Sequence, residues 1–125
     1  MRLQLKDVVS RSLILLGRYR VNKYHAKRTW SELCERWFAS KAECRRGEEL
    51  HLSERADEIT RLEYQYKLIL CQKPRVTITI DFRYKELTGD RRIIYEDTKG
   101  VLTRDFRTKL AWLKEKYNID VRLTE

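Results

Sequence analysis

The chain has 125 residues, of which 42% are hydrophobic and 38% are charged, with a single proline. This length predicts one folded domain that buries a core without disulfides, and the apolar run LILLG is too short for a membrane span or a signal-peptide core. The three cysteines, Cys34, Cys44 and Cys71, are an odd number without zinc-ligand spacing. Such usage favours free thiols and a cytoplasmic protein, in a bacterial host cell if the chain is phage-encoded.

The formal net charge of +9 is distributed unevenly. Residues 11–46 hold ten Lys and Arg residues against three acids, a net charge of +7. A polyanion is the natural partner of such a segment, and nucleic acid is favoured over a membrane surface because no basic amphipathic membrane helix stands out. The alternative is a basic face that contacts only solvent.

Apolar residues at helical spacing predict a short amphipathic helix over residues 3–16, which Gly17 ends. Residues 18–30 have no clear period and are rich in basic and aromatic side chains, so they are interpreted as an ordered loop or arm, and the arm is taken to extend over residues 18–39. The remaining residues, 40–125, are predicted to form the core of the domain.

Ser40 and Glu43 have the spacing of a capping box, which predicts a helix over residues 41–56. Glu43, Gly47, Leu50 and Glu54 lie on one stripe of that helix. A glycine inside a helix costs about 1 kcal/mol relative to alanine. Gly47 therefore predicts that another part of the chain packs closely against this stripe.

The period then changes from helical to alternating, which predicts three strands. Residues 62–70 form the first, residues 76–84 follow the turn at Pro74, and residues 91–99 return after a hairpin loop at residues 86–90.

Thr103 is a good N-cap for a helix that extends to about residue 117, and residues 119–123 read as a last short strand. A strand, a helix and a strand in this order imply a right-handed crossover to a parallel neighbour. The predicted fold is α/β: a helix, a three-stranded antiparallel meander, a helix and a parallel strand.

Charged residues gather at the end of the third strand. Because side chains alternate along a strand, Asp97 and Lys99 share one face and Glu96 lies on the other. If the register sets Asp81 near Tyr95, Asp81 and Asp97 are diagonal neighbours within reach of one cation. A slip of one residue would separate them.

These residue types suit metal-assisted hydrolysis of a phosphodiester. Carboxylates hold Mg²⁺, and a lysine beside them orients the attacking water or stabilises negative charge. Glu43, from the preceding helix, can complete the site. Simpler interpretations exist for each residue: Glu43 caps Ser40, Asp97 and Lys99 form one salt bridge, Asp81 is an exposed strand residue, and Glu96 is structural.

Five segments together resemble a family of small phage-encoded nucleases of the PD-(D/E)XK superfamily: NKYHAKRTW, FASKAECRRGEEL, LEYQYKLIL, TIDFRY and YEDTKGVLTRDFRTK. The resemblance covers roughly residues 21–123 and implies a restriction-endonuclease-like core, here with an extra N-terminal helix. By that resemblance Asp81 and Asp97 are ligands of Mg²⁺, for which Mn²⁺ can substitute, and Lys99 is the catalytic lysine. Glu43 is then a ligand or a water-positioning acid. The proline of the superfamily motif is absent, since Ile80 precedes Asp81.

The superfamily includes restriction enzymes, repair nicking enzymes, exonucleases and Holliday-junction resolvases. No separate sequence-reading module is evident, so recognition of DNA by charge and shape is expected. A small basic nuclease of this kind resembles a resolvase acting in DNA recombination, which needs two active sites and hence a homodimer. The predicted N-terminal helix is the candidate dimer contact, with packing on its own domain as the alternative.

Most of the predicted DNA-binding residues are basic side chains of the arm and of the two core helices. They are Arg18, Arg20, Lys23, Tyr24, Lys27, Arg28, Lys41 and Arg104. Two other functions stay open: a nuclease that nicks or degrades ordinary DNA, and a non-catalytic nucleic-acid-binding module on the same fold.

Overall fold

The computed structural model of the protein describes residues 27–99 and 101–125. Its elements, in chain order, are β1 (Thr29–Ser31), β2 (Arg36–Phe38), α2 (Lys41–Arg55), β3 (Ile59–Cys71), β4 (Val76–Glu86), β5 (Ile93–Thr98), α3 (Arg104–Tyr117) and β6 (Val121–Thr124). The described residues divide into two compact units, with the boundary between His51 and Leu52. The predicted N-terminal helix and residues 18–26 of the arm lie outside the described residues.

The first unit contains a hairpin that the sequence did not predict. β1 and β2 pair antiparallel, with Trp30 opposite Trp37, and the two indole rings meet edge to face at 5.6 Å. The interpretation of this segment as an ordered arm did not include any strand. Each strand has three residues, and two of the buried positions are Thr29 and Ser31. Strands this short with polar buried residues produce no apolar alternation to detect.

α2 begins and ends where the capping box predicted, within one residue. The Ser40 hydroxyl accepts a hydrogen bond from the Glu43 backbone N–H at 3.1 Å, which satisfies one of the free donors of the first turn. Gly47 packs against Phe38, as its cost to the helix predicted. A Cβ atom on Gly47 would lie 2.6 Å from Cζ of the Phe38 ring, a separation that no alanine can adopt without movement.

The second unit contains a four-stranded mixed sheet in the order β3-β4-β5-β6. β3, β4 and β5 are antiparallel neighbours, and β6 is parallel to β5. The predicted succession of helix, meander, helix and parallel strand is confirmed. β5 begins at Ile93, not at Arg91, because Arg91 has a positive φ of 54° and belongs to the turn.

α3 is held at both ends. The Thr103 hydroxyl accepts a hydrogen bond from the Phe106 backbone N–H, and Asn118 ends the helix in the left-handed conformation. At the C-terminal end, Lys116 Nζ and the Tyr117 hydroxyl donate to the backbone carbonyls of Leu70 and Ile69 on β3.

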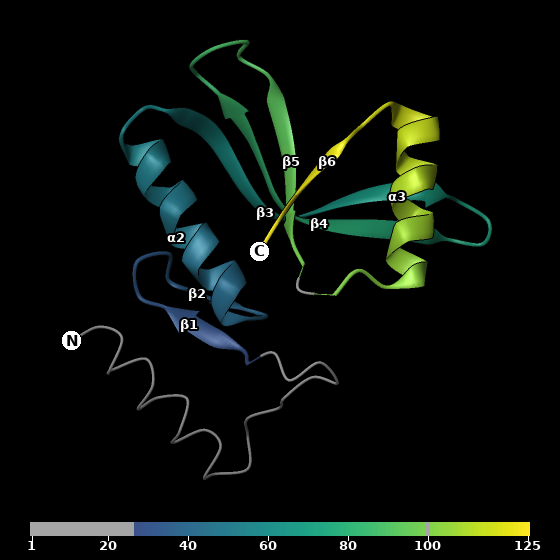
Figure 1. Ribbon diagram of the computed structural model, residues 1–125, viewed down its shortest axis with the longest axis horizontal. Helices are drawn as coiled ribbons and strands as arrows, with labels where there is room; N and C mark the ends of the chain where they lie inside the picture. Colours follow the sequence, from purple (N-terminus) through teal and green to yellow (C-terminus); the bar gives the residue numbers. More distant parts are fainter. Residues whose placement is uncertain (1–26, 100) are drawn as a thin grey trace, which may run out of the picture. The chain divides into compact units, whose positions relative to one another are not determined.

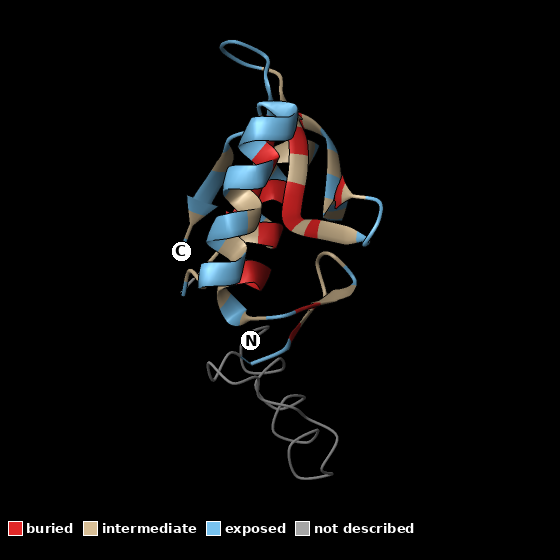
Figure 2. Cartoon of the chain, turned by 90° about the vertical axis from the view of Figure 1, so that its right-hand side faces the viewer, coloured by how far each residue is buried: buried red, intermediate tan, exposed pale blue. Residues whose placement is uncertain are grey.

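α3 packs against the apolar core of the sheet through Leu113, while most of its residues are exposed (Figure 2). The core beneath it is a cluster of four buried residues: Leu70, Ile78, Ile80 and Leu113. Burial of this cluster supplies the hydrophobic free energy that joins helix and sheet. None of the helices in residues 27–99 and 101–125 is long and apolar enough to cross a membrane.

The sheet divides in the middle of β4. This strand pairs with β3 from Val76 to Glu86, but its pairing with β5 runs only from Phe82 to Lys85. Before Phe82, β3 and β4 continue together towards α3 while β5 takes another direction (Figure 1). Asp81 immediately precedes Phe82, so it is the β4 residue next to the point where β4 and β5 separate. We call this point the fork.

Candidate active site

The strand register brings Asp81 and Asp97 together at the fork, although not in the predicted way. Arg83, and not Asp81, lies opposite Tyr95. Continuing the register past Phe82 and Glu96 places Asp81 directly opposite Asp97. The two carboxylates are therefore cross-strand neighbours and not diagonal ones, and they share a face of the sheet because directly opposed side chains do so.

A third polar residue joins this row from β3. The pairs Tyr64–Phe82 and Tyr66–Ile80 flank Gln65 and Asp81, so Gln65 lies opposite Asp81 on its other side. Gln65 was not among the predicted site residues, because it occupies an ordinary polar position in an alternating strand. Only the pairing register reveals that it shares a row with the two carboxylates.

Each aspartate uses one oxygen to close the fork. Asp97 Oδ1 accepts a hydrogen bond from the Asp81 backbone N–H at 3.0 Å, and Asp81 Oδ2 accepts one from the Thr98 backbone N–H at 2.9 Å. Where the strands separate, the backbone donors lose their partners in the ladder, and a buried unpaired N–H is costly. The two carboxylates replace those partners.

The second oxygen of each aspartate is less occupied. Asp97 Oδ2 is buried and, among the described residues, accepts no hydrogen bond, with Lys99 Nζ 3.4 Å away as an ion-pair partner. In the described part of the chain, Asp81 Oδ1 has a long contact of 3.4 Å with Gln65 Nε2. Two carboxylate oxygens thus remain with unused acceptor capacity, on neighbouring strands and beside one ammonium group.

Burial of the two carboxylates raises their pKa values. Desolvation, followed by the charge of Asp81, raises the pKa of Asp97 from 3.8 to about 7, and the Lys99 charge opposes this shift only in part. Desolvation also raises the pKa of Asp81, against the hydrogen bond from Thr98 and the charge of Lys99. The charge of Lys99 offsets this effect only in part at both carboxylates, and a divalent ion would supply further positive charge.

The donor set is consistent with Mg²⁺, because Asp97 Oδ2 is a buried carboxylate oxygen that accepts no hydrogen bond from the described residues. Mg²⁺ prefers hard oxygen ligands, and it is often held by one or two carboxylates with water and substrate phosphates completing the octahedron. Within the described ranges there is no group of three or more His, Cys, Asp or Glu residues that could hold a metal ion. The two carboxylates therefore suit a metal ion whose other ligands are water and substrate. They do not suit an ion that is coordinated by protein side chains alone.

The ammonium group of Lys99 is positioned from two sides. Besides its contact with Asp97, Nζ lies 4.4 Å from the centroid of the Phe106 ring, a favourable cation–π distance. Phe106 is fixed in the first turn of α3 by the Thr103 cap, and the Lys99 backbone N–H donates to the Thr124 carbonyl of β6. The side chain is nonetheless 35% exposed, so it remains accessible to a ligand.

Glu96 lies on the opposite face from this site, as the alternation predicted. It is fully buried and accepts hydrogen bonds from the hydroxyls of Tyr84, at 2.6 Å, and Thr124, at 3.3 Å. These bonds join β4, β5 and β6 behind the site. The contacts are those of a structural residue.

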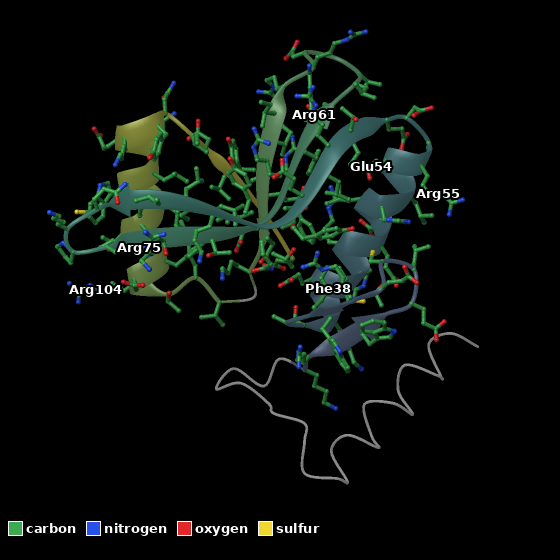
Figure 3. The ribbon with its side chains drawn as sticks, turned by 180° about the vertical axis from the view of Figure 1, so that it is seen from behind. Phe38, Glu54, Arg55, Arg61, Arg75 and Arg104 are labelled. Carbon is green, nitrogen blue, oxygen red and sulfur yellow. The ribbon has the colours of Figure 1, made fainter. Side chains whose placement is uncertain are left out.

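Glu43 belongs to the first unit, where it is buried in the first turn of α2. Its participation in the site of the second unit stays a prediction. Among the predicted DNA-binding residues, Lys27, Arg28, Lys41 and Arg104 are exposed, and Arg104 starts α3 (Figure 3). The guanidinium of Arg28 lies 4.8 Å from the centre of the Trp37 ring. Arg18, Arg20, Lys23 and Tyr24 lie outside the described residues.

The fold and the site define an α/β protein whose mixed sheet carries a buried aspartate pair beside a lysine. The chain belongs to the family described as "Protein of unknown function (DUF1064)", whose model matches residues 21–125. Comparison with curated proteins and with solved structures gave no match.

Proposed function

We propose that this protein is a Mg²⁺-dependent DNA endonuclease of the PD-(D/E)XK type, which hydrolyses phosphodiester bonds. The observation that carries the proposal is the fork itself: Asp81 and Asp97 lie opposite each other, each with one oxygen that the fork does not use, and Lys99 Nζ is 3.4 Å from one of those oxygens. A buried pair of like charges is costly to the folded protein. A site that tolerates this cost is a functional candidate.

In this proposal Asp81 Oδ1 and Asp97 Oδ2 hold the metal ion. When bound, Mg²⁺ supplies Lewis-acid chemistry, in that it acidifies water and offsets charge on the phosphate. Lys99 places a positive charge at the same point, where it stabilises negative charge that develops during hydrolysis. Phe106 keeps that ammonium group in place, and Glu43 is the proposed further acid from α2.

The proposed substrate is branched DNA of the Holliday-junction type. The net charge of +9 and the exposed basic residues of the arm and helices support binding to the phosphate backbone. Resolution of a junction needs two symmetric cuts, so the proposed active form is a homodimer.

The test is cleavage of a four-way DNA junction and of a linear duplex with the same arms, in Mg²⁺, in Mn²⁺ and in EDTA. Paired nicks in the junction that EDTA abolishes are the expected result. Equal cutting of both substrates would retain the nuclease and refute the preference for branched DNA. DNA binding without cleavage in either metal would refute the endonuclease and favour the non-catalytic binding module.

Variants assign the cleavage to this site. Asp81→Asn and Lys99→Met are each expected to lower the cleavage rate by at least about a hundredfold, because each removes a charge that acts on the phosphate. Asp90→Asn is the matched control, since Asp90 is an 83% exposed carboxylate in the β4–β5 turn. A loss of similar size in Asp90→Asn, or full activity in Asp81→Asn, would exclude the fork as the active site.

A further inference from the structure

We infer that Gln65 is a positioning residue of the site, whose amide holds the free oxygen of Asp81 towards the bound cation. This inference rests on the proposed function, because it assigns a role at the same metal site. It adds a third strand, β3, to a site that was otherwise built from β4 and β5.

The first observation is the contact itself. Gln65 Nε2 donates to Asp81 Oδ1 at 3.4 Å, and this is the oxygen that the fork leaves unused. A bond of this length is weak. It orients the carboxylate without occupying the oxygen fully, so the oxygen stays available to a cation. At metal sites, residues that hydrogen-bond to a ligand without touching the metal commonly set the orientation of that ligand.

The second observation is the backbone conformation of Gln65. Its φ is 52°, in the left-handed region, although the residue lies inside a strand. A non-glycine residue in this region is strained and persists where its surroundings enforce it. Such strain concentrates at sites where a side chain must be held in one direction.

A comparison within the same strand separates this strain from ordinary sheet irregularity. Arg61 also has a positive φ, of 56°, but the register of β3 against β4 shifts between Thr60 and Glu63. A β-bulge therefore explains Arg61. On both sides of Gln65 the register is the same, so a bulge does not explain it.

The side chain of Gln65 is exposed, so burial of its own apolar atoms does not offset the strain. Its amide donates to a carboxylate that faces the proposed cation. The strain is therefore understandable as the cost of directing an amide at Asp81.

The experiment measures Mn²⁺ binding to the full chain without DNA, by electron paramagnetic resonance at pH 8. The variants are Gln65→Gly, which removes the amide and relieves the backbone, and Gln65→Met, which removes the amide and keeps the length of the side chain. Arg61→Gly is the matched control, because it relieves a similar backbone conformation on the same strand. Asp97→Asn reports loss of a ligand.

We expect the dissociation constant for Mn²⁺ to rise by about tenfold in both Gln65 variants, at the lower end of the range for partners of metal ligands. Arg61→Gly is expected to stay within about twofold of wild type. Unchanged Mn²⁺ affinity in both Gln65 variants, with binding lost in Asp97→Asn, would overturn the role of Gln65 and leave the proposed metal site intact. Absence of Mn²⁺ binding by the wild type would overturn both.

Discussion

Replacing Asp97 by asparagine is expected to stabilise the metal-free protein while it abolishes cleavage. Asp97 is fully buried, and its raised pKa means that keeping it ionised costs folding free energy. Asparagine preserves the acceptor that Asp97 Oδ1 offers to the Asp81 backbone N–H and removes the negative charge. The substitution therefore separates the cost of the charge from the geometry of the fork.

The magnitude follows from two opposing terms. A pKa of about 7 against an ordinary value of 3.8 corresponds to about 4 kcal/mol at pH 8, since one pKa unit is about 1.4 kcal/mol. The asparagine amide N–H₂ would replace Oδ2, where it faces the ammonium group of Lys99, which is itself a donor. A buried unpaired donor costs about 1–3 kcal/mol. The net stabilisation is then about 1–3 kcal/mol, or a rise in Tm of about 3–12 °C.

The sign of this effect depends on pH. Because the folded pKa of Asp97 lies above its unfolded value, wild-type protein gains stability from protonation below about pH 4 and loses that gain as the pH rises through about 7. The advantage of Asp97→Asn should therefore be largest near pH 8, shrink below pH 7 and reverse near pH 4, where only the cost of the unpaired amide remains.

The assay is thermal unfolding of both proteins between pH 4 and pH 8, in EDTA and in Mg²⁺. Mg²⁺ should raise the Tm of the wild type, because it binds the folded state, and leave the variant unchanged. A variant less stable than wild type at pH 8 in EDTA would show that Asp97 is a stabilising partner of Lys99 and not a strained ligand. That result would refute the electrostatic basis of the site.

Three further substitutions test other parts of the structure. Phe106→Leu removes a cation–π contact worth about 0.5–2 kcal/mol, so it should slow cleavage severalfold in the wild type. In a Lys99→Met background it should cause no further loss, and additive losses would show that Phe106 does not act through Lys99. Lys27→Ala should weaken DNA binding and lower the slope of log affinity against log salt by about one, without abolishing cleavage; an unchanged slope would remove Lys27 from the interface. Gly47→Ala should lower the free energy of unfolding by about 1–3 kcal/mol through its clash with Phe38, despite the gain in helix propensity of about 1 kcal/mol. Urea titration measures this change, and a more stable alanine variant would show that the Phe38 ring moves aside freely.

The elements that the sequence predicted are those whose signals are local. The cap at Ser40, the cap at Thr103 and the long alternation of β3 and β4 each depend on residues within one turn or one strand. The β1–β2 hairpin was missed because its three-residue strands bury polar side chains. Short elements of this kind are stabilised by tertiary packing, which no local pattern records.

The predicted proximity of the two aspartates is correct although the predicted register was wrong. The reason is geometric. The predicted pairing of Asp81 with Tyr95 differs from the observed register by two residues. A shift of two keeps every side chain on its own face, whereas a shift of one would have moved Asp97 to the other side of the sheet. Gln65 escaped prediction because neither its left-handed backbone nor its cross-strand partner is encoded in the alternation of β3.

The fork explains why charges stand at the end of an otherwise apolar strand. Strands that separate must satisfy the backbone donors left behind, and a carboxylate does this with one of its two oxygens. Asp81 and Asp97 each do so for the other strand, which holds their second oxygens within the same small region. The hydrogen bonds that stabilise the separation of β4 from β5 thereby hold two buried carboxylates on opposed residues, and the cost of their proximity is lowered by protonation or by positive charge beside them. Folding and the proposed chemistry depend on different oxygens of the same two residues, so an asparagine at either position tests the two roles separately.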